Sequence, residues 1–480
     1  MSVTRVVLSR ALPGSSRRTQ EAAQPATRWV WVAAVLLFAA YGTVSLRLHQ
    51  RMLTTGYDLG IFEQAVRSYA HGHLPVAELK GPGFPLLGDH FSPVLATLAP
   101  LYRIWPTPVT LLLAQAALLA VAVVPIAAFA HRVVGGRGAM VVAFGYGSSW
   151  GIAQAVGFDF HEIAFAVPLL AFSLVALAED RWRAAALWAL PLLTVKEDLG
   201  LTVGAIGSVM AWRGARRTGA ALAATGVVGS ALEILVVIPS FNPGGRFTYW
   251  DKISASGTGT GDPQGVGNTL YHWTLGVITP DPKATMLVML LAPTAFAALS
   301  SSLMWVCVPT LAWRLLSDNP DYWGTNFHYS AVLMPMVFVA FVDAQRSWEG
   351  RPRRHALAVA GAVGALLLPQ FPLGQLLQPD TWHTSPRVAQ AHRILELIPD
   401  GATVAASNRL APQLTDRAQV TVFGFPGSRP SPQWIVVDTA TPMGWPVSPE
   451  QEGQLIAQAR SDGYVTVVDR DGCLLLRRQR

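Results

Sequence analysis

The sequence has little charge and almost no cysteine. Only 14% of its 480 residues are charged, whereas about a quarter are charged in a soluble globular domain. Hydrophobic residues make up 51%, and the mean hydropathy is +0.35. The shortage of charge and the long apolar runs predict a polytopic membrane protein. The two cysteines, one in an apolar run and one near the C-terminus, provide neither a disulfide framework nor a cysteine-based metal site.

Several motifs of well-known enzyme classes are also absent. The chain contains no Walker motif, no Rossmann glycine fingerprint, no nucleophile elbow and no HExxH sequence. Nucleotide hydrolysis and serine or zinc peptidase chemistry are therefore unsupported. The net charge of +7 does not indicate a nucleic-acid partner, because the arginines lie in short clusters between apolar runs, as membrane topology requires.

These arginine clusters set the expected topology. Several arginines precede the first apolar run, Trp29–Leu46, which lacks a clear small-residue cleavage site and is therefore predicted to be an uncleaved first helix. We expect residues 1–27 to be disordered and cytoplasmic. Threading the remaining runs predicts about 11 transmembrane helices. They occupy residues 28–368, with long outer loops at 49–108 and 239–283.

The first outer loop is expected to carry helices that do not span the bilayer. Leu59, Phe62, Val66 and Tyr69 recur at helical spacing and predict a short amphipathic helix in the membrane interface. The next helical segment, Pro93–Trp105, is shorter than the roughly 20 residues needed to cross the hydrocarbon core. It is therefore predicted to be interfacial or re-entrant.

Residues 369–480 change in character. Val388–Leu397 predicts a short helix, and apolar runs bounded by Pro, Gly and Asp predict strands. The expected strands are Thr403–Ser407, Val420–Phe425, Trp434–Asp438, Tyr464–Asp469 and Cys473–Arg477. These elements predict a small α/β domain, which the expected topology places outside the cytoplasm.

Ionisable residues recur at the outer ends of the apolar segments. Charged groups near hydrocarbon are costly to keep, so their convergence on one face indicates a reaction or binding site. One outgoing limb, Ala184–Val195, reaches only about 18 Å into a core of about 30 Å, which places the three charges after it at membrane depth. The candidate site residues are Asp58, Asp89, His90, Asp159, His161, Lys196, Glu197, Asp198 and Arg246.

Each candidate also has a structural explanation. Asp58 suits a general base and suits equally an N-cap, which stabilises a helix by about 1 kcal/mol. Lys196 suits a phosphate because its ammonium is a point charge, but it could also pair with Glu197. Arg246 and the aromatic residues of the second loop suit a sugar or a lipid headgroup, or else an interfacial belt. A divalent cation is a further possibility, for which the candidate ligands are Asp89, His90, Asp159 and His161.

Four motifs together resemble an uncharacterised family of predicted bacterial and archaeal membrane proteins, catalogued as a domain of unknown function. They are YDLGIFEQ (Tyr57–Gln64), GDHFSP (Gly88–Pro93), FDFHE (Phe158–Glu162) and KED (Lys196–Asp198). The match covers roughly Trp29–Val342. That family in turn resembles the C-type glycosyltransferase superfamily in its long first outer loop, its Asp just after the first helix and its C-terminal extracytoplasmic domain.

The resemblance implies a membrane glycosyltransferase that moves a sugar from a polyprenyl-phosphate donor to a lipid, glycan or protein acceptor of the cell envelope. Asp58 matches the catalytic Asp of the superfamily's first loop and would deprotonate the acceptor hydroxyl. Lys196 and Arg246 would neutralise the departing phosphate. The superfamily's first loop often carries paired acids, whereas Asp58 has no acidic neighbour before Glu63. The residues that would position the sugar or a cation are His90, Asp159 and His161.

Two other functions stay open at this point. A transporter or flippase for a lipid-linked or polar solute would use the same charges as a path through the membrane. A non-catalytic envelope assembly protein would use its outer tail to bind partners. All three hypotheses place a multi-pass protein in the plasma membrane, with its N-terminus in the cytoplasm and membrane lipids around it.

Overall fold

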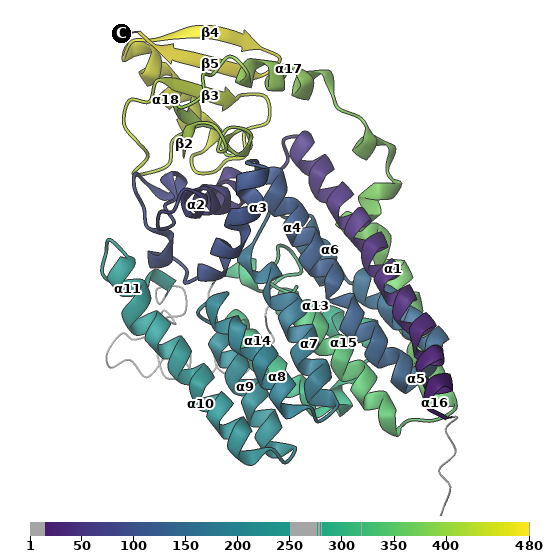
Figure 1. Cartoon of the computed structure of the whole chain (residues 1–480). Coiled ribbons are helices and arrows are strands. Elements are labelled where there is room, and N and C mark those ends of the chain that lie inside the picture. Colours follow the sequence, from purple (N-terminus) through teal and green to yellow (C-terminus); the bar gives the residue numbers. More distant parts are fainter. Residues whose placement is uncertain (1–14, 250–275, 277–278, 280, 318, 480) are drawn as a thin grey trace, which may run out of the picture.

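The computed structural model describes residues 15–249, 276, 279, 281–317 and 319–479, and residues 15–27 through their backbone alone. These residues form a bundle of long helices with a small sheet domain on one end of it (Figure 1). Short helices of the first expected outer loop lie between the two parts (Figure 1). We call the end of the bundle that carries the sheet domain the site end.

The bundle contains the apolar segments that the sequence predicts. In the described part of the chain, three segments are long and apolar enough to cross a membrane: Arg28–Gln50, Pro108–Gly147 and Arg216–Phe241. The helices, in chain order, are α1 (Ser15–Gln50), α4 (Pro108–Val121), α5 (Val123–Gly147), α6 (Trp150–Val156), α7 (Ala166–Ala178), α8 (Trp182–Ala189), α9 (Leu199–Trp212), α10 (Arg216–Leu232), α11 (Ile238–Phe241), α13 (Asp281–Leu291), α14 (Val308–Leu316), α15 (Leu333–Ala344) and α16 (Arg351–Leu367).

Small residues allow α9 and α10 to pack backbone against backbone. A Cβ atom added to Gly207 would lie 2.4 Å from the nitrogen of Ala223, and one added to Gly219 would lie 2.4 Å from the nitrogen of Ala211. Hydrocarbon does not drive helices together, so such close approach is a main source of helix association in membranes. The α9–α10 pair is therefore a stable hairpin, visible at the lower left of Figure 1.

Polar contacts at the far end of the bundle, away from the sheet domain, tie helices from distant parts of the chain. Arg213, directly after α9, lies 2.7 Å from the Asp343 carboxylate of α15. The Ser301 hydroxyl donates to the same carboxylate at 2.7 Å, and Arg346 donates to the carbonyl of Ala178 at 2.5 Å. The arginine clusters that set the expected topology thus gather at this end.

Several elements differ from their expected bounds. The helix α1 begins at Ser15, inside the segment expected to be disordered, because that segment contains Ala, Gln, Glu and Arg, which are good helix formers. The apolar segment 284–316 is not helical throughout: α13 ends at Leu291, and the 3₁₀ turn that follows contains Pro293, which cannot donate a helical hydrogen bond. Most of the expected outer loop 239–283 lies outside the described residues.

The two short helical segments of the first outer loop are present. The first is α2 (Ile61–Ala70), and the second comprises the 3₁₀ turn η4 (Pro93–Leu98) and α3 (Ala99–Ile104). In α3, Leu101 and Ile104 are exposed, as an interfacial helix requires. In α2, by contrast, Val66 is fully buried in a hydrophobic cluster that continues into the sheet domain. The apolar face of α2 is therefore covered by protein. The helical spacing of its apolar residues could not show whether protein or lipid covers that face.

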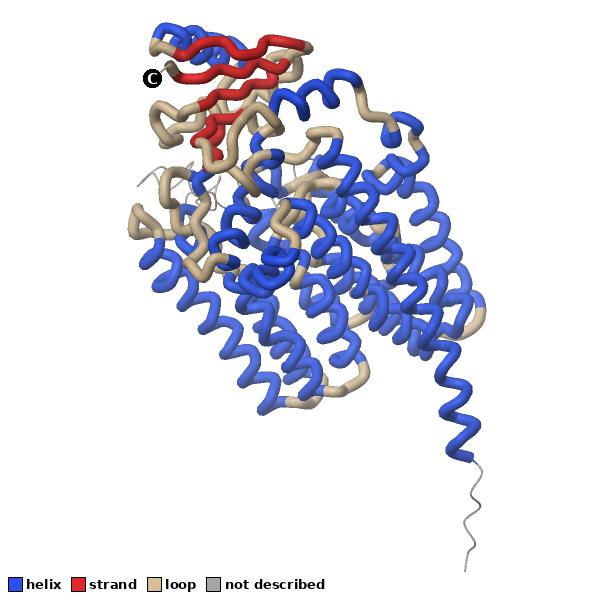
Figure 2. The backbone as a smooth tube through the Cα atoms, turned by 45° about the horizontal axis from the view of Figure 1, so that its top comes forward, coloured by secondary structure: helices blue, strands red, loops and turns tan. Residues whose placement is uncertain are grey.

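The C-terminal domain is built on a five-stranded sheet with strand order β2-β1-β3-β5-β4, shown in red in Figure 2. Strand β1 lies between β2 and β3 and is parallel to both, whereas β5 is antiparallel to β3 and β4. The strands are β1 (Thr403–Ala406), β2 (Gln419–Val422), β3 (Trp434–Asp438), β4 (Tyr464–Arg470) and β5 (Cys473–Arg478). The predicted small α/β domain is thus confirmed.

Two helices accompany this sheet, and the sequence analysis found one of them. The expected helix is α17 (Pro386–Leu395), and the missed one is α18 (Pro449–Ser461). Only Ile456 and Ala459 of α18 are buried, so its apolar periodicity is weak. The usable signal was the capping box formed by Ser448 and Gln451.

Candidate functional site

A cavity of about 350 Å³ lies at the site end of the bundle. Its walls come from the turn after α1, the loop after α2, the loop before α7, the turn before α9 and the segments around α14. Among the lining residues are seven of the nine candidates, namely Asp58, Asp89, His90, His161, Lys196, Glu197 and Asp198. Segments far apart in the sequence thus meet around one space.

Asp58 lies in the π-helical turn η1 (Gly56–Gly60), which joins α1 to α2. Its side chain is 32% exposed, and its Oδ1 atom lies 3.2 Å from Nε2 of His161. The N-cap positions of η1 and α2 are Thr55 and Gly60, so Asp58 occupies neither. Single π-helical turns are rare and occur frequently at functional sites. The structure therefore places a carboxylate and an imidazole together at the cavity wall.

Asp159 lies directly behind this pair rather than in the cavity lining. It accepts hydrogen bonds from the Thr55 amide at 3.0 Å and from the Thr55 hydroxyl at 2.6 Å, and the same hydroxyl is 3.3 Å from Oδ2 of Asp58. Burial, and then the charge of Asp58, raise the pKa of Asp159 well above its usual range. A second carboxyl group, from the loop before α7, thus lies beside Asp58, and its surroundings favour the protonated form.

His161 is packed between aromatic rings. Its ring centroid lies 3.5 Å from that of His328 and 5.3 Å from that of Phe158, and both contacts are stacked. The Nδ1 atoms of His161 and His328 are buried and have no hydrogen-bond partner within the described residues. His328 is a cavity residue that the motifs did not single out.

Lys196 and Glu197 of the KED motif contact different segments. The Lys196 ammonium lies 3.0 Å from the Glu162 carboxylate, and Glu197 accepts from Nδ1 of His90 at 2.7 Å and from the Phe91 amide at 3.2 Å. The alternative in which Lys196 pairs with its neighbour Glu197 is therefore not the observed arrangement. Glu162, which is 1% exposed, is a further site residue that the motif contained without an assigned role.

Asp89 faces a cation that sequence reasoning missed. Its carboxylate lies 2.6 Å from the ammonium of Lys80, in the loop after α2. Burial raises the pKa of Asp89, but the charges of Lys80, His90 and Lys196 and the hydrogen bond from Lys80 together outweigh it, so this pKa lies below its usual range. Burial likewise lowers the pKa of Lys80, but the surrounding groups, Asp89 first among them, together outweigh it, so the pKa of Lys80 is raised. This pair stays charged at neutral pH.

Arg246 is placed differently from the other candidates. It is exposed and does not line the cavity, whereas Phe247 and Tyr249 beside it do. The Tyr249 ring lies 4.6 Å from that of His90. This part of the second loop therefore presents aromatic rings to the cavity.

The proposed cation ligands do not form one group. Within the described ranges, no cluster of three or more His, Cys, Asp or Glu side chains is arranged to hold a metal ion. Each of the four candidates has a separate partner. The observed pairs are Asp89 with Lys80, His90 with Glu197, Asp159 with Thr55 and His161 with Asp58.

Glu233 is a further buried acid, which is not among the nine candidates. It opens a second π-helical turn, η7 (Glu233–Val237), between α10 and α11. Its side chain is 7% exposed, and its Oε2 atom has no partner among the residues that the structure describes. Ile234, the next residue, lines the cavity. An acidic residue inside a long apolar run indicates a functional site, and this criterion would have identified Glu233 from the sequence.

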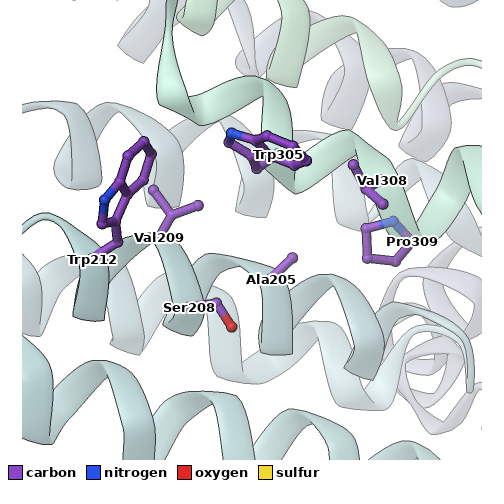
Figure 3. A pocket seen from close by; sticks show the side chains of 7 residues that line it. All are labelled: Ala205, Ser208, Val209, Trp212, Trp305, Val308 and Pro309. Carbon is purple, nitrogen blue, oxygen red and sulfur yellow. The ribbon is translucent and has the colours of Figure 1, made fainter.

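A second hollow, of about 510 Å³, lies farther from the sheet domain and is apolar (Figure 3). One wall is a stripe of α9, Ala205, Ser208 and Trp212, and the other is formed by the 3₁₀ turn η12 (Ser302–Cys307) and the start of α14. We call it the apolar groove. Leu201, one turn before Ala205 on the same face of α9, lines the polar cavity, so a single stripe of this helix serves both.

Comparison with known proteins gives a family and a fold. The profile of the family described as "Predicted membrane protein (DUF2079)" matches residues 48–475, which confirms the expected family resemblance and extends it through the C-terminal domain. No curated protein matches the chain in sequence.

Among solved structures, the fold is similar to that of ArnT from Cupriavidus metallidurans. The structure of ArnT bound to undecaprenyl phosphate aligns with a TM-score of 0.54 at 13% identity and covers 94% of this chain and 98% of that one. The apo structure aligns with a TM-score of 0.52 at 12% identity and the same coverage. The expected polytopic helical fold with a small C-terminal sheet domain, which is similar to the fold of ArnT, and a multi-pass membrane location are thus confirmed.

Proposed function

We propose that this chain, which belongs to the DUF2079 family of predicted membrane proteins, is a glycosyltransferase that moves a sugar from a polyprenyl-phosphate donor to an acceptor hydroxyl. One observation carries the proposal: Asp58 and Lys196 line the same cavity of about 350 Å³. A base for the acceptor and a cation for the leaving phosphate are the two groups that this transfer needs. The ArnT-like fold supports the choice of reaction, and the undecaprenyl phosphate bound to ArnT supports the donor class.

In the proposed reaction, Asp58 is the general base. The acceptor oxygen attacks the anomeric carbon, its proton passes to Asp58, and the bond from that carbon to the phosphate oxygen breaks with inversion. His161 orients the carboxylate through the 3.2 Å contact. Burial and the charge of Asp58 favour the protonated form of Asp159, which limits the second negative charge beside the base.

Lys196 is the proposed phosphate ligand. Its ammonium faces the cavity while Glu162 holds it from behind at 3.0 Å. An incoming phosphate would share this cation with Glu162, and the charge that grows on the leaving oxygen would strengthen the contact in the transition state. The Lys80–Asp89 pair, on the same cavity wall as Tyr57, would contact the sugar.

The apolar groove is the proposed path of the polyprenyl tail. It continues along α9 from Leu201, which is 41% exposed, and so leads away from Lys196 toward the far end of the bundle. Isoprenoid chains are hydrocarbon, and an apolar groove between helices is the surface that binds them favourably.

The proposed orientation places the site end outside the cytoplasm and the N-terminus inside. The far end of the bundle carries Arg132, Arg181, Arg213 and Arg346, two of which pair with Glu179. A concentration of arginine at one end is typical of the cytoplasmic side. The acceptor would then be a component of the cell envelope.

The test is Asp58→Asn in the full-length chain, assayed with undecaprenyl-phosphate-linked monosaccharides and an envelope fraction as acceptor. We expect the release of undecaprenyl phosphate to fall by about 10²–10⁴-fold, the usual contribution of a general base. The control Glu179→Gln alters a carboxylate at the far end and is expected to leave the rate unchanged. Full turnover by Asp58→Asn would contradict the mechanism, and transport of the lipid-linked sugar without release of the phosphate would indicate a flippase instead.

A further inference from the structure

The turn that carries Asp58 is held by the C-terminal domain. Asn408, two residues after the end of β1, accepts a hydrogen bond from the Gly56 amide through its backbone carbonyl at 2.7 Å. Its side-chain Oδ1 accepts from the Tyr57 amide at 2.9 Å, across 351 positions of sequence. Asn408 is 6% exposed. Two consecutive amides just before Asp58 therefore find their acceptors on one buried residue of another domain.

These bonds replace the cap that the turn itself lacks. The first amides of a helical turn have no partner inside it, and the N-cap residue, Thr55, makes no side-chain cap bond to η1. The approach is also close, because a Cβ atom on Gly56 would lie 2.6 Å from Cβ of Ala411. The turn is thus pressed against the C-terminal domain and capped by it.

Both Asn408 and the ring of Tyr57 are fixed by their surroundings. Next to Asn408, the amide of Ser407 donates to the Val436 carbonyl at 2.9 Å, which extends the pairing of β1 with β3. The Tyr57 ring lies 5.1 Å from the ring of Phe425 and 4.7 Å from that of Trp445, both in the C-terminal domain. The backbone and the side chain of the residue before Asp58 therefore follow the position of the sheet.

We propose that Asn408 is a positioning residue for Asp58, and that the C-terminal domain is a working part of the site rather than an attached binding module. The inference rests on the proposed function. Asp58 has to meet the acceptor hydroxyl within hydrogen-bond reach, and a displacement of about 1 Å in a reacting group can cost about 10²-fold in rate. Asn408 sets that position through the backbone of Tyr57, without touching the substrate.

Removing the Asn408 side chain should leave the two domains docked. Other contacts join them independently: Gln64 donates to the Val420 carbonyl at 3.0 Å, Arg67 to the Thr415 carbonyl at 2.8 Å, and Gln413 to the His49 carbonyl at 2.9 Å. Gln413 is a matched control, because it also links the C-terminal domain to this part of the chain, at the end of α1, and its hydrogen bonds go to His49 rather than to the Asp58 turn.

The experiment compares Asn408→Ala, Asn408→Asp and Gln413→Ala in the full-length chain, with kcat and KM measured separately from the release of undecaprenyl phosphate. For Asn408→Ala we expect a kcat about 10- to 100-fold lower with the donor KM unchanged. Asn408→Asp should restore most of the rate, since a carboxylate oxygen can also accept from the Tyr57 amide. Gln413→Ala should match wild type. An unchanged kcat in Asn408→Ala, no rescue by Asn408→Asp, or an equal loss in Gln413→Ala would overturn the inference.

Hydrogen exchange separates this inference from the proposed function. Peptides that cover residues 54–60 should exchange faster in Asn408→Ala than in wild type or Gln413→Ala, whatever reaction the protein catalyses. If Asp58→Asn kept its activity while this difference in exchange was present, the mechanism would fall and the role of Asn408 in holding the turn would stand. Equal exchange in all three proteins would overturn that role directly.

Discussion

Two regions of the molecule bury polar groups, and they do so in different ways. At the junction of α2 with the C-terminal domain, the fully buried Glu63 accepts from the Tyr102 hydroxyl, and Gln64 and Arg67 donate to backbone carbonyls. In the cavity, ion pairs such as Lys196 with Glu162 border about 350 Å³ of space. The polar groups of the junction contact other protein groups, whereas those of the cavity also border an unfilled volume. A buried charged group therefore indicates a functional site when it lines a cavity, and burial alone does not.

After Asp58→Asn, the largest effect is expected at Lys196, one of the cavity groups in this comparison. The change Lys196→Met keeps the length of the side chain and removes the charge that would bind phosphate, so we expect the transfer rate to fall by about 10²–10³-fold. Lys196→Arg should retain part of the activity because it keeps the charge. The rate of undecaprenyl phosphate release measures both. Arg181→Gln, at the far end of the bundle, is the control, and more than half of the wild-type rate in Lys196→Met would refute the assignment.

The next effect is on stability and arises from Glu63, at the junction of α2 with the C-terminal domain. Burial raises the pKa of Glu63 to about 7, although the hydrogen bond from Tyr102 lowers it, against about 4.5 in the unfolded chain. The folded state therefore binds more protons than the unfolded state between these values. Stability falls as the pH rises from about 4.5 to about 7, by roughly 3 kcal/mol in total, and levels off above.

Glu63→Gln should remove that contribution. Its amide oxygen can still accept from Tyr102, so the variant should be the more stable protein at pH 8 and nearly equal to wild type at pH 4.5. The difference in Tm between the two proteins, measured in detergent at both pH values, checks this. Transfer activity at neutral pH should stay near wild type, since Glu63 does not line the cavity. A difference in Tm that did not change with pH would contradict the account.

The sequence predicted that the ionisable residues gather at one site, but it did not predict which of them form ion pairs with one another. Asp58, His161 and Lys196 could be brought together because each follows or precedes an apolar run at its expected outer end, so topology alone gathers them. Which charges meet depends on loop paths that carry no periodicity. Lys80 reaches Asp89 within one loop, and Glu162, rather than Glu197, reaches Lys196.

The contribution of the C-terminal domain was also beyond sequence reasoning. Its strands could be predicted from apolar runs and turn residues, because these signals are local. The contact of Asn408 with the Tyr57 amide joins residues 351 positions apart through one side chain and leaves no pattern in either segment. Single long-range hydrogen bonds of this kind are set by packing of whole domains, which only the structure supplies.

The smallest expected effect tests the apolar groove, which has space but no charge. Ala205→Trp would fill the middle of the groove, where Ser208 and Trp305 form the walls, without touching the polar cavity. If the groove holds the polyprenyl tail, the donor KM should rise by about 10-fold for an undecaprenyl donor, equal to about 1.4 kcal/mol of lost binding. The rise should be smaller for a donor with only two or three isoprene units, whose tail ends near Leu201. Ala224→Trp, on the exposed face of α10, adds the same bulk outside the groove and should leave KM unchanged. An equal rise for long and short donors would show that the substitution distorts the cavity instead. No rise for either donor would mean that the tail lies outside the apolar groove.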